Sequence, residues 1–250
     1  MTNKDQYPDI LYKYIDITGG LSMLQNEELW FRRIGFLNDP YDCYLTHACQ
    51  EEYPLWEVEF NANRVFEYTG ICSLSATANN YLMWSYYNLH KGICVGINMA
   101  FVYSALINHY IKEVNAYLTF RKVIYKDELP DLKLRNIVPL DFQKKPINDK
   151  PSDTAQDEID SFLSTKAKKW EHENEYRLIL RQRPNPALVL SDPVKLRLSN
   201  LINRVYLGCK FDGDTDAIFT LAKEKKFDVY KFKLQSNTYG LDAEKIYPHN

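Results

Sequence analysis

Two glutamates and an arginine stand at alternate positions in residues 170–180, WEHENEYRLIL. Alternate side chains of a strand leave the same face, so Glu173, Glu175 and Arg177 are expected to share one face. Carboxylates about 7 Å apart on one face repel each other unless a partner compensates their charge. The spacing therefore predicts either a solvated strand end, where Arg177 pairs with one glutamate, or a site where a fixed carboxylate stabilises positive charge.

A second group of polar and aromatic residues lies in residues 71–98, ICSLSATANNYLMWSYYNLHKGICVGIN. Ser73 and Ser75 alternate with apolar residues, so a strand would place both hydroxyls on one face. Two asparagines then favour a helix start, and the helix would carry Trp84 and Tyr87 on one flank. An apolar strand follows. The stretch predicts either a site between these elements or a strand–helix–strand core unit with two incidental serines.

Residues near the N-terminus add a cation and two carboxylates. Lys13 is the one charged residue of the predicted strand ILYKY, in which Tyr14 follows it. Asp39 lies in an Asn-Asp-Pro turn, where its side chain can bond its own backbone. Asp39 and Asp42 could instead offer carboxylates to a metal ion or a ribose.

Composition excludes several classes of protein. The 250 residues carry a formal net charge of −2, which gives no whole-protein attraction to nucleic acid or anionic membrane. Five cysteines without C-x-x-C spacing argue against a disulfide framework or a zinc cluster. No phosphate-binding glycine motif, H-E-x-x-H motif, signal segment or membrane-length apolar run occurs. We expect a cytoplasmic protein with no bound metal and no membrane contact.

Helical and alternating patterns are interleaved irregularly along the chain, which predicts an α+β fold. We expect one domain over residues 1–250, with a curved or split mixed sheet flanked by helices. A polar segment near 130–153 with three prolines after residue 138 predicts a mobile loop. The predicted helices are 21–26, 46–66, 101–111, 154–170 and 215–225, together with the helix that starts at Asn79 or Asn80 and stops at Gly92. The predicted strands are 10–14, 29–31, 71–75, 93–97, 118–125, 173–180, 205–208 and 229–234.

Several segments occur in the order typical of one family. ILYKY, LWF followed by NDPYD, the S-x-S strand with MWSYYNLHKGICVGI, W-x-x-E-x-E-Y-R and VYLG together resemble the bacterial domain-of-unknown-function family 2971. A second, weaker resemblance is to ADP-ribosyltransferases of the bacterial toxin type, in which a basic first strand, a serine strand and a late E-x-E strand follow one another. That resemblance implies an ADP-ribosyltransferase-like fold that binds NAD.

The same resemblance implies roles for individual residues. Lys13 would hold the NAD ribose or phosphate, and the serine strand, Ser73 and Ser75, would brace the nicotinamide pocket. Glu175 would stabilise the ribosyl cation, with Glu173 beside it orienting the acceptor. Lys13 stands where histidine or arginine is usual, and Leu74 interrupts the usual Ser-Thr-Ser. Tyr14, Trp84 and Tyr87 could stack on the nicotinamide or the adenine, and Arg177 is also assigned to NAD binding.

The resulting hypothesis is an NAD-dependent ADP-ribosyltransferase that modifies a protein or nucleic acid, as a toxin or phage-defence effector with an antitoxin or defence-system partner. A second hypothesis is a nuclease that holds Mg²⁺ with Asp39, Asp42, Glu173 and Glu175. A third is a non-enzymatic module that binds a nucleotide or peptide. If the glutamates repel each other, Glu175→Gln is expected to leave stability unchanged or slightly raised.

Overall fold

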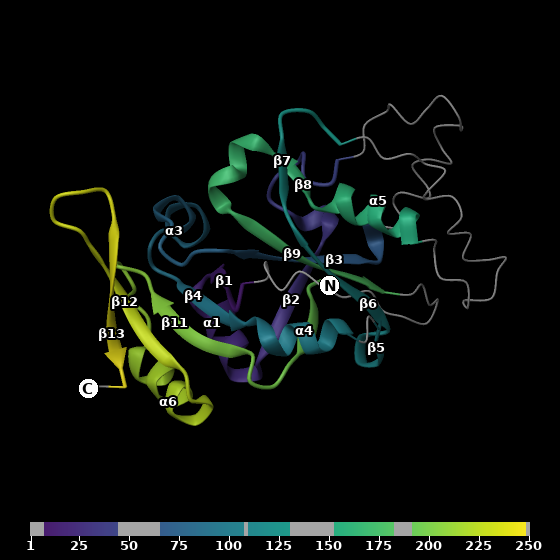
Figure 1. Cartoon of the computed structure of the whole chain (residues 1–250). Helices are drawn as coiled ribbons and strands as arrows, with labels where there is room; N and C mark the ends of the chain where they lie inside the picture. The colour runs from purple at the N-terminus through teal and green to yellow at the C-terminus, as the bar shows by residue number, and fades with distance from the viewer. Residues whose placement is uncertain (1–7, 45–65, 108–109, 131–152, 183–191, 249–250) are drawn as a thin grey trace, which may run out of the picture.

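The computed structural model describes residues 8–44, 66–107, 110–130, 153–182 and 192–248, which form an α+β fold (Figure 1). A large mixed sheet runs through the molecule with helices against it. The predicted loop near 130–153 and the predicted helix 46–66 lie almost wholly outside the described residues. None of the described helices is long and apolar enough to cross a membrane.

The large sheet has eleven strands among the described residues. Its main path has the order β13-β12-β11-β4-β1-β3-β9-β6-β5, and β2 joins β3 to β10 beside it. Neighbours pair antiparallel except β11 and β12, which are parallel, so the sheet is mixed as predicted. The strands are β1 (Ile10–Ile15), β2 (Glu28–Arg33), β3 (Thr69–Ser75), β4 (Ile93–Asn98), β5 (Tyr110–Ile111), β6 (Ala116–Lys122), β9 (Glu175–Gln182), β10 (Val194–Arg197), β11 (Ile202–Leu207), β12 (Asp228–Leu234) and β13 (Leu241–Tyr247).

A small second sheet of two parallel strands, β7 (Ile124–Lys126) and β8 (Thr165–Ala167), lies beside the helix α5 (Figure 1). Figure 1 shows α6 at the opposite end of the molecule, near β11 and β12. Among the residues that the structure describes, the α-helices are α1 (Ile17–Asn26), α3 (Tyr81–Asn88), α4 (Met99–Ile107), α5 (Asp153–Leu163) and α6 (Thr215–Lys225), and the 3-10 helices are η1 (Ile34–Phe36), η3 (Lys112–Val114) and η5 (Lys168–Glu173).

The sheet opens between β1 and β3. These strands share a single register pair, Tyr12 with Ser75, within the described residues. By contrast, all six residues of β1 pair with β4, and all seven of β3 pair with β9. Backbone hydrogen bonding is therefore interrupted on one flank of β1, and side chains from β1 and β3 can face a common space there.

Apolar side chains from most of the strands fill the core. Leu11, Cys72, Val95 and Leu178 are fully buried and belong to one cluster. A smaller cluster surrounds the fully buried Trp84 of α3, whose ring packs edge-on against Tyr14 at 5.3 Å and Phe232 at 5.5 Å between centroids. This second cluster anchors α3 against the sheet beside the opening.

Two predicted helices end earlier than expected. The helix predicted for 154–170 stops at Leu163, and the Ser164 and Thr165 hydroxyls donate to the carbonyls of Asp160 and Ser161 in its last turn, at 2.7 and 2.8 Å. The chain then pairs with β7 as β8. The helix predicted for 101–111 likewise stops at Ile107, and β5 follows it. Both errors arise because tertiary strand pairing overrides an apolar pattern that fits a helix locally.

The prediction that Glu173 lies on the strand of Glu175 is also wrong. Glu173 ends η5, and β9 begins at Glu175. Asn174 between them has a left-handed conformation with φ of 45°, which breaks the alternation. The two glutamates therefore come from a turn and a strand, and they can meet the same partner from different directions.

Candidate functional site

A cavity of about 190 Å³ lies at the opening between β1 and β3. Side chains from elements far apart in the sequence line it. Among them are Lys13 from β1, Ser73 and Ser75 from β3, Glu173 from η5 and Glu175 from β9. Tyr14, Asp42 and Tyr87 line it too, so the structure brings together most of the residues that the sequence analysis selected.

Lys13 and the two serines are fixed by hydrogen bonds. The Lys13 Nζ donates to the Ser73 carbonyl at 2.9 Å, which ties β1 to β3 where their ladder is absent. The Ser75 hydroxyl donates to the Glu173 carbonyl at 2.7 Å. A hydrogen bond from the Ser73 side chain reaches the Glu175 carboxylate. The serine strand thus holds both glutamates. Ser75 binds the backbone carbonyl of Glu173, and Ser73 binds the carboxylate of Glu175.

Glu175 is 3 % exposed and is held by two cations. The Arg177 Nε donates to Oε1 at 2.8 Å, and the Lys166 Nζ donates to Oε2 at 3.3 Å. Burial acts to raise the pKa of Glu175, but Arg177, Lys166 and the Ser73 hydrogen bond outweigh it and lower the pKa to about 2. Glu175 is therefore a carboxylate throughout the physiological range.

Arg177 lies beneath the cavity and does not line it. Its guanidinium binds Asp42 through both terminal nitrogens, at 2.8 and 2.7 Å, and also donates to the Leu163 carbonyl at 2.7 Å. Burial acts to lower the pKa of Arg177, yet Glu175 and Asp42 raise it well above its usual value. The geometry gives Arg177 the role of holding Glu175, whereas the sequence analysis assigned it to NAD binding.

Glu173 is 2 % exposed, and a donor reaches each of its carboxylate oxygens. The Tyr87 hydroxyl donates to Oε1, and the Lys166 Nζ donates to Oε2 at 2.5 Å. Asn38 in turn donates to the Tyr87 hydroxyl at 3.5 Å. Tyr87 therefore holds the Glu173 carboxylate by a hydrogen bond. Tyr87 also lines the cavity, where the sequence analysis predicts that it stacks on a ligand.

Of the other two aromatic residues assigned to NAD binding, one lines the cavity and the other is buried in the core. Tyr14 lines the cavity, and its hydroxyl donates to the Thr77 carbonyl at 2.9 Å. Trp84 does not line it: the side chain is fully buried, and the indole N–H donates to the Ala78 carbonyl at 2.8 Å. Trp84 is a core residue that positions α3, and the prediction that it stacks on a ligand does not fit this geometry.

Asp39 and Asp42 are both engaged within the protein. The Asp39 Oδ1 accepts the Tyr41 N–H at 2.9 Å, which confirms the predicted turn. Both oxygens of Asp42 accept hydrogen bonds from Arg177. In the ranges that the structure describes, no group of three or more histidine, cysteine, aspartate or glutamate side chains could hold a metal ion.

Sequence reasoning missed Lys166, which is buried between the two glutamates. The predicted repulsion between Glu173 and Glu175 was the one feature of the sequence that indicated a nearby cation. The sequence offers three lysines in TKAKKW, and the periodicity places all of them on a helix. Arg32, Asn38 and Tyr12 also line the cavity and were not selected.

The comparisons with known proteins give one match. Residues 83–178 match the family model described as a protein of unknown function, DUF2971. The predicted family resemblance is confirmed over this segment. It includes Lys166, Glu173, Glu175 and Arg177, whereas Lys13 and the serine strand precede it. Neither the search of curated proteins nor the search of solved structures finds a match.

Proposed function

We propose that this protein transfers ADP-ribose from NAD to a macromolecule. The observation that carries the proposal is the distribution of charge around the cavity. Asp42, Glu173 and Glu175 form with Arg177 and Lys166 a buried ion cluster of three carboxylates and two cations. The cluster has one surplus negative charge, and all three of its carboxylate residues line the cavity.

The same wall also carries positive charge. Lys13 and Arg32 line the cavity, and the Arg32 side chain is 48 % exposed, with Asp192 at 3.3 Å. A ligand that carries both a cationic ring and phosphates matches a wall with charges of both signs. NAD has this pattern, because its nicotinamide ring is positively charged and its pyrophosphate is negative.

The size of the cavity limits how much of NAD it can enclose. Sites that bury a drug-sized ligand have volumes of roughly 300–1,000 Å³. A cavity of about 190 Å³ suits the nicotinamide and its ribose, and leaves the adenosine half against the outer surface. Tyr14 and Tyr87 offer aromatic surface to the enclosed end.

The proposed chemistry requires a fixed negative charge near the ribose. When the bond from the ribose carbon to the nicotinamide nitrogen breaks, its electron pair leaves with the nicotinamide and positive charge develops on the ribose. Glu175, already ionised and fixed by Arg177, stabilises that charge without reorganising. A nucleophilic atom of the acceptor then bonds to the ribose carbon and loses its proton. The toxin or phage-defence role, with its partner, stays a prediction from the resemblance.

Of the two alternative hypotheses, the metal-dependent nuclease fits the geometry less well. A Mg²⁺-dependent nuclease needs free carboxylate oxygens, and Arg177 and Lys166 occupy those of Asp42, Glu173 and Glu175. A binding module would use the same cavity without chemistry. NAD that stays intact after long incubation with the protein and cell extract would favour that module.

NAD binding can be tested by NMR saturation transfer and calorimetry on the full chain. We expect the nicotinamide protons to receive more saturation than the adenine protons. Lys13→Met should weaken binding by roughly 1.5–3 kcal/mol, the usual contribution of a hydrogen bond to a charged group. Lys91→Met is the matched control, since Lys91 is exposed and pairs with Asp212. Absence of NAD binding at millimolar concentration would overturn the proposal.

A further inference from the structure

The small sheet of β7 and β8 delivers two side chains to the glutamates. Tyr125 and Lys166 are register partners in this sheet. The Tyr125 hydroxyl oxygen accepts the Glu175 N–H at 2.8 Å, and the Lys166 Nζ donates to the carboxylates of both Glu173 and Glu175. The small sheet therefore contacts both the backbone N–H and the carboxylate of Glu175.

The Lys166 ammonium is almost completely buried. Its side chain is 3 % exposed, and its nitrogen lies 4.9 Å from the centre of the Trp170 ring. Without it, three buried carboxylates would face the single guanidinium of Arg177. Charges at these distances interact much more strongly in a protein interior than in water, so the cluster would then favour uptake of a proton.

Of the other titratable groups around Lys166, two tyrosines and a cysteine stay neutral, and one lysine donates to a backbone carbonyl. Burial raises the pKa of the Tyr87 hydroxyl from α3, and Glu173 raises it further. Burial also raises the pKa of Tyr125 from β7 and of Cys43 next to Asp42. Lys13 on β1 donates to the Ser73 carbonyl. Lys166 is therefore the cation that balances the glutamate pair.

We propose that Lys166 is a positioning residue that holds Glu173 and Glu175 side by side in their charged forms, so that the site keeps its surplus negative charge in acid. Lys166 does not touch the transferred group and acts through the carboxylates. Its effect on activity rests on the proposed function, whereas its effect on the carboxylates does not.

The test is a pH titration of the glutamate side chains by carbon-13 NMR, with no NAD present. In the unaltered protein the Glu175 carboxyl signal should stay constant down to the acid limit of the folded state. In Lys166→Met, which keeps the length of the side chain, one of the two carboxyls should titrate about 1–3 pH units higher. Lys168→Met is the matched control, because Lys168 is exposed and lies 3.9 Å from Asp127. A titration in Lys166→Met equal to that of the unaltered protein would overturn the proposal.

A second variant keeps the test decisive if Lys166→Met does not fold. Lys166→Met combined with Glu173→Gln again leaves one surplus negative charge in the cluster. We expect this double variant to fold and its Glu175 to titrate as in the unaltered protein. A double variant that is no more stable than the single one, or that does not fold, would show that charge balance is not what Lys166 supplies. Since no step involves NAD, these outcomes are independent of whether the protein is a transferase.

Discussion

Both carboxylate oxygens of Glu175 bind buried cations, and this changes what its substitution should do. The sequence suggests two glutamates that repel each other, so that removing one charge costs no stability. The structure contradicts that reasoning, because Lys166 lies between the glutamates and Arg177 holds Glu175 from the other side. Glu175 thus forms buried ion pairs with two cations, Lys166 and Arg177.

Glu175→Gln is therefore expected to destabilise the protein. The glutamine amide keeps one acceptor oxygen where the carboxylate accepts from both Arg177 and Lys166, and breaking buried ion pairs in this way costs about 3–5 kcal/mol. Glu171→Gln, an exposed glutamate four residues earlier, should change stability by less than about 0.5 kcal/mol. Urea denaturation followed by circular dichroism measures both. Equal midpoints for the two variants would mean that the ion cluster contributes nothing to folding.

The lowered pKa of Glu175 also predicts how stability depends on pH. In the unfolded chain a glutamate titrates near its ordinary pKa of about 4.3, whereas in the folded protein Glu175 titrates near 2. Its contribution is fully present above about pH 5 and is lost as the pH falls toward 2, on the order of 3 kcal/mol in total. Stability of Glu175→Gln should fall less steeply over this window. Parallel curves for the two proteins between pH 5 and 2 would contradict the lowered pKa of Glu175.

At the scale of single residues, the sequence could predict those cavity residues that lie on strands with a clear alternating pattern. Lys13, Ser73 and Glu175 lie on strands whose apolar alternation is clear, and β1, β3 and β9 are adjacent in the sheet. Lys166 could not be found in this way. Its position depends on the pairing of β8 with β7, which are about forty residues apart, and local periodicity carries no information on that pairing.

At the scale of elements, α3 connects the core to the cavity. Asn80 caps it as predicted, accepting the N–H groups of Leu82 and Met83 at 3.0 and 3.2 Å, and its amide donates to the His172 carbonyl of η5. The helix then places Trp84 in the core and Tyr87 on Glu173. A helix start is readable from the sequence because its hydrogen bonds are local.

Asn80→Ala should lower stability by about 1–2 kcal/mol, because the cap and the contact to η5 are lost together. Asn79→Ala is the control, since Asn79 is exposed and accepts from the Thr77 hydroxyl. Thermal melts of both variants give the comparison. If Asn79→Ala is the more damaging of the two, α3 does not depend on this cap.

Tyr125→Phe tests the link between the small sheet and β9. The substitution removes the acceptor of the Glu175 N–H and leaves a buried donor without a partner, which costs about 1–3 kcal/mol. Tyr239→Phe, in a fully exposed side chain, should have no measurable effect. Hydrogen exchange at the Glu175 amide should also speed up in Tyr125→Phe. Unchanged exchange there would show that the contact is dispensable.

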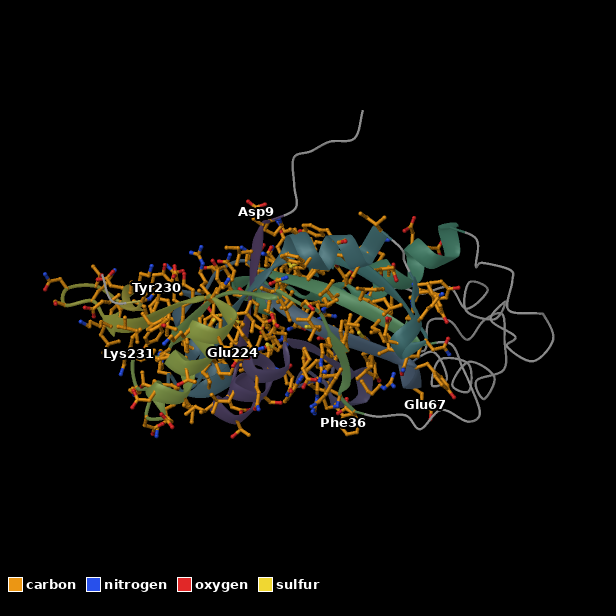
Figure 2. The ribbon with its side chains drawn as sticks, turned by 90° about the horizontal axis from the view of Figure 1, so that it is seen from below. Asp9, Phe36, Glu67, Glu224, Tyr230 and Lys231 are labelled. Atoms are coloured by element: carbon orange, nitrogen blue, oxygen red, sulfur yellow. The ribbon has the colours of Figure 1, made fainter. Side chains whose placement is uncertain are left out.

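At the scale of the whole molecule, the sheet connects the cavity to both ends of the fold. Figure 2 shows Tyr230 and Lys231 of β12 toward one end and Glu67, just before β3, toward the other, with Phe36 of η1 at the surface. The α+β class and the mixed sheet could be predicted, because strand and helix periodicities are visible along the chain. The opening between β1 and β3 could not, since strand order depends on contacts between distant residues.

The core of this sheet sets the stability of the whole fold. Leu178 of β9 is fully buried, so Leu178→Ala should cost roughly 2–5 kcal/mol. Leu234→Ala, at a leucine that is 62 % exposed, should cost less than about 0.5 kcal/mol. Denaturation curves of the two variants test this. A small loss for Leu178→Ala would mean that β9 is not part of the main cooperative unit.

The proposed function depends on chemistry at Glu175, and nicotinamide release tests it most directly. The protein would be incubated with NAD labelled in its adenosine part and with cell extract, and free nicotinamide and labelled macromolecules would be measured together. The unaltered protein should release nicotinamide and label an acceptor. Folded Glu175→Gln, verified by circular dichroism under the assay conditions, should do so about 10²–10³-fold more slowly, the usual loss when one electrostatic stabiliser is removed. Equal release by the two proteins, or intact NAD with the unaltered protein, would contradict the account.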